Sequence, residues 1–308
     1  MRVVFMGTPE FAVPCLQKLI DCGHDVRGVF TQPDKPQGRK MILTAPPVKQ
    51  LALENNIPVY QPLKMKDGTA LEMLKEADPE LVIVVAYGKI LPKEILEYPK
   101  YGCINIHASL LPELRGAAPI QWSVINGLKK TGVTSMQMDE GLDTGDMLLK
   151  GELEIGENDT AGEMHDKLSV IGAEILEKTI DLLLENKLNP EKQDHEKFTY
   201  APMLSKELSP INWNLTADEV HNKIRGLSPW PSATAVLNGK KVKIHRSVRV
   251  SCKGASAGEI VETGKQLIVS CGDGECIEIL NIQAEGKKAM SAVDFMRGNP
   301  LNIGDKFE

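Results

Sequence analysis

An unbroken apolar run, Leu81–Ala86, constrains the fold more than any other feature of this chain. It has no alternating polar positions, which is typical of a strand buried on both faces of a parallel sheet. Strand and helix patterns alternate through the first 200 residues. We therefore predict an α/β fold with a doubly wound, Rossmann-like, mostly parallel sheet whose strand carboxyl ends meet at one edge, where ligands bind.

The pattern predicts strands at 2–6, 25–31, 57–60, 80–86, 102–107 and 132–138, and helices at 9–23, 48–55, 69–77, 118–126 and 160–186. Thr160 and Glu163 form a capping-box pattern at the start of the last of these helices, and Thr216 and Glu219 repeat that pattern further on.

The chain divides by pattern into three parts. Residues 1–188 carry the α/β pattern, and residues 189–206 are polar and read as a linker. Residues 207–308 contain short apolar alternations broken by Asn-Gly and Gly turns, which favour a small, OB-like β-barrel. We expect two domains joined by that linker.

Composition narrows the class of protein. The longest apolar run is far shorter than the roughly 20 residues of a membrane-spanning helix. The apolar stretch among the first residues is too short for the core of a signal peptide. None of the six cysteines forms a C-x-x-C pair. We expect reduced thiols, no zinc site and a cytoplasmic location.

Charge is uneven along the chain, whose net charge is -6. Residues 207–308 carry 13 basic and 12 acidic side chains, and within them Lys240–Lys253 contains six basic residues and no acidic one. Such a stripe suits contact with a polyanion. The alternative is an ordinary solvated strand face, and charge alone does not separate the two.

Asn105 and His107 are the first candidates for chemistry. They lie two residues apart on a predicted strand, so their side chains point the same way at its carboxyl end. An amide and an imidazole placed side by side can stabilise an oxyanion and transfer a proton. The alternative is a histidine that merely bonds a loop carbonyl.

A second cluster follows the next predicted strand. Residues 139–146 hold four acidic side chains and two glycines. Asp143 is placed to orient His107 by opposing charge. A metal-binding acidic loop is the rival interpretation, but only His107 offers a nitrogen ligand, so we expect no metal.

Three common motifs are missing. Gly7-Thr8-Pro9 follows the first strand without the G-x-G-x-x-G spacing of a dinucleotide site, and no P-loop is present. No G-x-S-x-G nucleophile elbow occurs.

Several segments together carry a family resemblance that covers essentially the whole chain. They read FMGTPEF from Phe5, AYGKILP from Ala86, NIHASLLP from Asn105, RGAAPIQ from Arg115 and QMDEGLDTGD from Gln137. With Pro229-Trp-Pro231, these segments resemble the methionyl-tRNA formyltransferase family. The Asn-x-His and Asp set alone indicates only the wider formyltransferase group.

The resemblance implies an enzyme that transfers a formyl group from 10-formyltetrahydrofolate to the α-amine of initiator methionyl-tRNA. It implies Asn105, His107 and Asp143 as catalytic residues and a folate pocket from the loops that follow three strands. The pocket residues are Ser109, Leu110, Leu111, Pro112, Ala86, Tyr87, Gly88, Ile90, Leu91, Asp139 and Gly141.

The resemblance also implies a tRNA-binding loop in the insertion 32–47. Loops of this length within a compact domain usually have a function. We expect tRNA contacts from Lys35, Arg39, Lys40, Lys206, Lys240, Lys241 and Lys243. Nothing in the sequence demands an oligomer, and we expect a monomer that does not bind membranes.

Three rival functions share some of these features. A sugar-nucleotide formyltransferase does not need the basic loop, and a formyl-folate hydrolase needs no tRNA-sized second domain. A catalytically silent RNA-binding protein has no need of Asn105, His107 and Asp143 together.

Overall fold

The computed structural model describes residues 1–38 and 41–308. The chain forms two compact units that interleave along the sequence. The first comprises residues 1–116, 132–153 and 165–200, and the second residues 117–131, 154–164 and 201–308. The boundaries at 188 and 206 remain predictions, and each unit is described here by itself.

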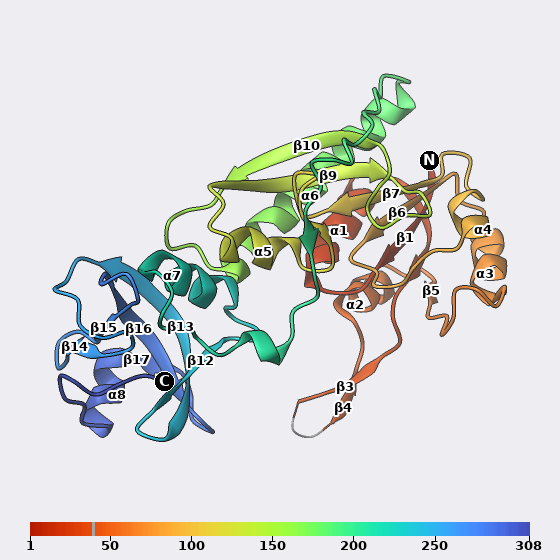
Figure 1. The fold of residues 1–308 in the computed structure, drawn as a ribbon. Coiled ribbons are helices and arrows are strands. Elements are labelled where there is room, and N and C mark those ends of the chain that lie inside the picture. Colours follow the sequence, from red (N-terminus) through yellow and green to blue (C-terminus); the bar gives the residue numbers. More distant parts are fainter. Residues whose placement is uncertain (39–40) are drawn as a thin grey trace. The chain divides into compact units, whose positions relative to one another are not determined.

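A seven-stranded sheet forms the centre of the first unit (Figure 1). Its strands lie in the order β10 (Met147–Glu154), β9 (Lys130–Gln137), β7 (Cys103–His107), β6 (Leu81–Val85), β1 (Arg2–Gly7), β2 (Asp25–Phe30) and β5 (Val59–Tyr60). Strands β5, β2, β1, β6 and β7 run parallel to one another. The predicted mostly parallel α/β sheet is confirmed.

Helices cover both faces of this sheet. They are α1 (Val13–Asp21, preceded by η1, Glu10–Ala12), α2 (Pro47–Glu54), α3 (Thr69–Ala77), α4 (Lys93–Leu96) and α6 (Ala161–Leu184). Buried residues of α3 and α4 pack against Val4, Met6, Val82 and Val84 on one face. On the other face, Gly172 of α6 lies against β7 and α1.

Strand β9 departs from the expectation that all strand carboxyl ends share one edge. It runs antiparallel to β7, with Gln137 opposite Ile104 and Thr134 opposite His107. The carboxyl end of β9 therefore lies beside the start of β7. The loop that follows must fold back across the sheet to bring any of its residues to His107, and parallel-sheet reasoning did not foresee this path.

The insertion 32–47 contains a hairpin of β3 (Lys35–Gln37) and β4 (Ile42–Thr44), which projects away from the sheet (Figure 1). Arg39 and Lys40 lie outside the described residues. Met41, Ile42 and Leu43 beside them are all more than half exposed.

The second unit is built on a six-stranded antiparallel sheet. Its strands are β12 (Ala233–Leu237), β13 (Lys240–Val250), β14 (Ile260–Glu262), β15 (Ile268–Ser270), β16 (Cys276–Ala284) and β17 (Met290–Ser291). The unit also holds α5 (Pro119–Ile125), α7 (Ala217–Gly226), α8 (Ala292–Gly298) and η2 (Lys206–Leu208).

The last residues of the chain join the two edges of this sheet. Val236 of β12 and Glu308 exchange both main-chain hydrogen bonds, and Ile260 of β14 donates to the carbonyl of Asp305. The chain end thereby covers both sheet edges, as closure into a barrel requires. The predicted C-terminal β domain is confirmed.

One cysteine expectation is wrong. Cys252 and Cys276 form a disulfide, with their Cα atoms 5.9 Å apart. The β13–β16 register sets Val250 opposite Cys276, so a cysteine two residues beyond Val250 lies next to Cys276 although 24 positions separate the pair. Burial raises the pKa of Cys15, Cys103 and Cys271 to about 12, which keeps these thiols protonated.

Candidate active site

Asn105 and His107 lie on β7, the strand at which the parallel part of the sheet ends and the antiparallel strand β9 follows. His107 is 6% exposed, and its Nε2 lies 3.0 Å from the carbonyl oxygen of Leu114. A carbonyl can only accept, so Nε2 carries the proton of this hydrogen bond. The side-chain amide of Asn105 is half-buried and has no hydrogen-bond partner among the residues that the structure describes.

Asp143 comes to His107 from the loop between β9 and β10. Its Oδ2 lies 3.7 Å from His107 Nδ1 and accepts a hydrogen bond of 2.8 Å from the backbone amide of Gly116. The predicted proximity of Asp143 and His107 is present in the structure. A protonated His107 would therefore direct Nδ1–H toward a carboxylate while Nε2–H points to Leu114.

Main-chain groups of 114–116 hold both side chains. Leu114 supplies the carbonyl for His107, and Gly116 supplies the amide for Asp143. This segment is itself held by Thr199, whose hydroxyl accepts from the Leu114 amide and whose carbonyl accepts from the Arg115 amide. The next residues along the chain form the short β8 (Arg115–Gly116) and β11 (Tyr200–Ala201) pair.

The loop 138–146 has a tight internal structure. Asp139 Oδ1 accepts from the Gly141 amide at 3.0 Å and from the Thr144 hydroxyl at 2.6 Å. At Gly145, a Cβ would collide with the carbonyl of Gln137. Asp143 adopts a left-handed conformation, with φ of 52°, which costs a non-glycine residue free energy unless other contacts hold it.

Gln193 is a contact of this loop that sequence reasoning missed. Its side-chain amide donates to the carbonyls of Asp143 and Gly145. The residue sits in a polar stretch predicted to be a linker, and neither periodicity nor a motif marks it.

The predicted folate-binding residues divide by exposure. Ala86, Gly88, Ile90, Asp139 and Gly141 are exposed, and Leu110 and Pro112 are partly exposed. The side chains of Tyr87, Leu91, Ser109 and Leu111 are buried. The Tyr87 hydroxyl donates to the sulfur of Met65 in the core, and its carbonyl accepts from Thr8 and Gln32.

The site can hold developing negative charge and move a proton. An unpartnered amide and an imidazole with a nearby carboxylate are the groups needed to stabilise an oxyanion and act as general acid and base. Within the described ranges, no three His, Cys, Asp or Glu residues are grouped to hold a metal ion.

The predicted polyanion contacts are exposed where the structure describes them. The Lys35 ammonium donates to Gln32, and Lys206 lies exposed on η2. No helix of the described chain is long and apolar enough to cross a membrane.

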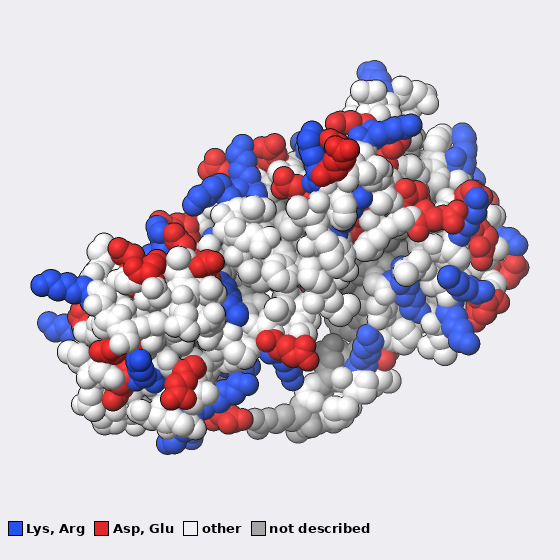
Figure 2. Space-filling view, viewed as in Figure 1, with Lys and Arg blue, Asp and Glu red and all other residues white. Residues whose placement is uncertain are grey.

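The basic strand β13 has two different halves. Lys240, Lys241 and Lys243 are exposed and form no ion pair with any described residue. Arg246 pairs with Glu163, and Arg249 pairs with Glu157 and Asp218. Acidic and basic side chains also mingle over the visible surface (Figure 2). Among the basic residues of β13, the three lysines are therefore those that retain uncompensated charge.

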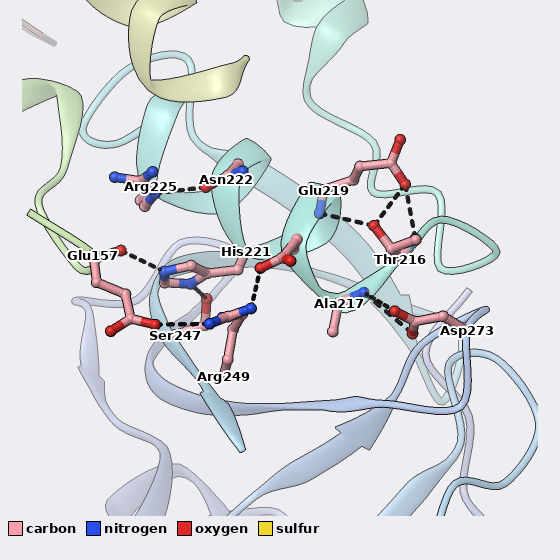
Figure 3. A network of polar contacts seen from close by, with 11 residues as sticks. Glu157, Thr216, Ala217, Glu219, His221, Asn222, Arg225, Ser247, Arg249 and Asp273 are labelled. Carbon is pink, nitrogen blue, oxygen red and sulfur yellow. Dashed lines mark hydrogen bonds and ion pairs between the residues drawn. The ribbon is translucent and has the colours of Figure 1, made fainter. Parts of the chain in front are cut away.

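A buried histidine lies next to the ion pair of Arg249 and Glu157 (Figure 3). His221 of α7 is 2% exposed, and its Nε2 lies 3.0 Å from the carbonyl oxygen of Glu157. Nε2 therefore carries the proton, and Nδ1 accepts from the Ser247 hydroxyl at 2.9 Å. Burial, with smaller contributions from Arg225 and Arg249, lowers the pKa of His221 below its ordinary value of 6.5.

This histidine predicts a pH dependence of stability. Below about pH 6.5 the unfolded chain binds a proton that the folded chain resists, so the free energy of unfolding falls as the pH drops and is fully recovered above that value. We expect His221→Gln, which keeps a donor for Glu157, to lose less stability than the original between about pH 7.5 and pH 5. Urea unfolding of both proteins across that range measures the difference, and parallel curves would contradict the assignment.

Comparisons with known proteins agree on one family. The formyl transferase family model matches residues 1–180, and the formyl transferase C-terminal domain model matches residues 203–300. Proteins named methionyl-tRNA formyltransferase from Alkaliphilus oremlandii and Bacillus subtilis are each 49% identical over 306 residues. These matches cover 99% of this chain and 99% and 96% of the relatives.

A solved structure shares the fold. The N-formyltransferase of Helicobacter canadensis, crystallised with folinic acid and dTDP-3-aminofucose, superposes with a TM-score of 0.72 at 21% identity. The match covers 92% of this chain and 99% of that one.

Proposed function

Because the chain belongs to the methionyl-tRNA formyltransferase family, it is a formyl-transferring enzyme, and we propose that it transfers the formyl group of 10-formyltetrahydrofolate to methionine on initiator methionyl-tRNA. The observation that carries this proposal is the near-half identity, over the full length, to relatives of that name. The pairing of His107 with Asp143 beside the open Asn105 amide agrees with it.

The donor in this proposal is a formylated folate. Folinic acid, itself a formylated folate, is bound in the structurally similar Helicobacter canadensis enzyme, which supports a folate donor. On this chain the exposed residues Ala86, Gly88 and Ile90 follow β6. These groups, with Ser109–Pro112 and the loop at Asp139 and Gly141, would contact the donor.

The proposed reaction has three steps. The methionine amine attacks the formyl carbon, a tetrahedral oxyanion forms, and folate N10 leaves with a proton while the amine loses one. Asn105 would donate its amide N–H to the oxyanion. His107 would turn Nε2–H from Leu114 to the same oxygen and exchange the reaction's proton, with Asp143 stabilising its charged form.

The acceptor would be held by basic groups on both units. Lys35, with Arg39 and Lys40 of the same insertion, would meet the tRNA near its acceptor end, and Lys206, Lys240, Lys241 and Lys243 would contact its backbone. We propose further that the enzyme acts as a monomer in the cytoplasm, where aminoacylated tRNA is used.

A transfer assay tests the function. The protein is mixed with donor labelled in its formyl group and with methionyl initiator tRNA, methionyl elongator tRNA or no acceptor. We expect labelled formyl-methionyl-tRNA from the initiator and little from the elongator. Labelled formate released without acceptor would instead indicate a hydrolase, and label on an amino-sugar nucleotide would indicate a sugar formyltransferase. Binding of tRNA without transfer would indicate a silent RNA-binding protein.

A further inference from the structure

Gln193 connects a buried arginine to the loop that carries Asp143. We propose that it is a positioning residue for formyl transfer, which fixes the main chain of Asp143 so that the carboxylate stays directed at His107. The inference rests on the proposed function of Asp143. Gln193 itself would touch neither substrate.

The donor side of the Gln193 amide is fully used. Its Nε2 donates to the carbonyl of Asp143 at 2.8 Å and to the carbonyl of Gly145 at 2.7 Å. The residue is 5% exposed, so water competes little for these bonds. One side chain thus holds both ends of the turn at Asp143.

The acceptor side is fixed by Arg115. Gln193 Oε1 accepts from Arg115 Nε at 3.0 Å and from Nη2 at 2.7 Å. A guanidinium can only donate, so the oxygen of the amide must face it and the NH₂ must face the two carbonyls. The charge of Arg115 therefore determines which way round the amide lies.

Arg115 is itself immobilised. It is 6% exposed, its guanidinium carbon lies 5.2 Å from the centre of the Phe198 ring, and its Nη1 lies 3.3 Å from His195 Nδ1. Its neighbour Gly116 donates to the Asp143 carboxylate. Residues 115 and 116 therefore act on Asp143 from two directions, through Gln193 on its main chain and directly on its side chain.

Asp143 needs this support because of its backbone. Its φ of 52° is unfavourable for a residue with a Cβ, and its Oδ2 stands 3.7 Å from His107 Nδ1, at the limit of a useful ion pair. Without the two bonds from Gln193, the turn can relax and carry the carboxylate away from the imidazole. A displacement of about 1 Å in a catalytic group can cost about 100-fold in rate.

The test compares Gln193→Ala and Gln193→Met with the original protein. We expect kcat for formyl transfer to fall about 10- to 100-fold, with KM for donor and tRNA changed less than about 3-fold, because Gln193 acts through Asp143 rather than on a ligand. Gln193→Met fills the same volume, so it reports on the hydrogen bonds if the alanine variant folds poorly.

Two further measurements separate positioning from general stability. In an Asp143→Asn background, measured under single-turnover conditions, Gln193→Met should lower the rate by less than about 3-fold, because the group it positions is already lost. Thr179→Val is the matched control, since it removes a buried hydrogen bond to Ser135 elsewhere in the same unit. It should lower the melting temperature and leave kcat unchanged.

Three results would overturn the proposal. They are an unchanged kcat in both Gln193 variants, a rise in KM alone, or the same fold-loss in the Asp143→Asn background as in the original. If the original protein itself transfers no formyl group, the proposed function fails, and that outcome is distinct from an active enzyme that tolerates Gln193→Met.

Discussion

Replacing His107 by alanine is expected to lower kcat for formyl transfer by about 10³- to 10⁴-fold. The change removes a proton-transfer group and a donor to the oxyanion together, and leaves Asp143 without its partner at 3.7 Å. Because His107 acts on the reacting atoms, the affinity for tRNA should stay close to that of the original. Single-turnover transfer with saturating tRNA and labelled donor measures the chemical step directly.

Two further variants test this prediction, one that preserves the fold and one that serves as a control. His107→Gln keeps a side-chain donor for Leu114 and so protects the fold, and we expect it to remain nearly as slow as the alanine variant. His165→Ala removes a histidine of the same unit that packs on Phe11, and it should transfer at the original rate. A rate near normal in His107→Gln would exclude His107 from the proton transfer.

Reversing the charge of Lys240, Lys241 and Lys243 to glutamate is expected to weaken tRNA binding by about 100-fold at physiological salt. These lysines are exposed and form no ion pair with a described residue, so each is available to a phosphate. The plot of log affinity against log salt should become less steep by about 3, one for each lost contact. Fluorescence anisotropy of labelled tRNA over a salt series measures both quantities.

The same strand supplies the control. Arg246→Gln and Arg249→Gln remove charge from side chains already paired with Glu163, Glu157 and Asp218. These two substitutions should change the slope of log affinity against log salt by less than about 1, the value expected for one lost phosphate contact. Equal effects from the arginines and the lysines would mean that the division of β13 has no role in binding, and an unchanged slope in the lysine variant would leave the stripe as a solvated strand face.

Local sequence signals predicted much of the fold. The helix expected over 69–77 is α3, with those bounds, and the capping boxes at Thr160 and Thr216 both form. These features depend on residues close together in the sequence, where hydrogen-bonding rules are strong. The direction of β9 could not be predicted in this way, because an apolar alternation fits a parallel or an antiparallel strand equally well.

Long-range contacts between single residues could not be predicted, because no sequence pattern marks them. The chain end bonds β12 and β14 through a few main-chain groups, and the Cys252–Cys276 pair depends on the register of β13 against β16. Segments 117–131 and 154–164 belong to the second unit although they precede residue 188. No local hydrophobic periodicity in the sequence marks these contacts or these segments.

The candidate site shows the same division. Asn105 and His107 were predicted to lie on one strand, and both lie on β7. The approach of Asp143 was expected, but not the loop that folds back to bring it there. Gln193 and the main chain of 114–116 were missed, because a bond from a side chain to a backbone carbonyl 50 residues away follows no motif.

The most direct test of the mechanism is a crystal structure of the protein with a stable formyl-folate analogue and methionyl-adenosine. We expect the formyl oxygen about 2.7–3.1 Å from Asn105 Nδ2 and His107 Nε2, and the methionine amine about 3–3.5 Å from the formyl carbon. A formyl group bound away from Asn105 and His107, with the amine out of reach, would contradict it.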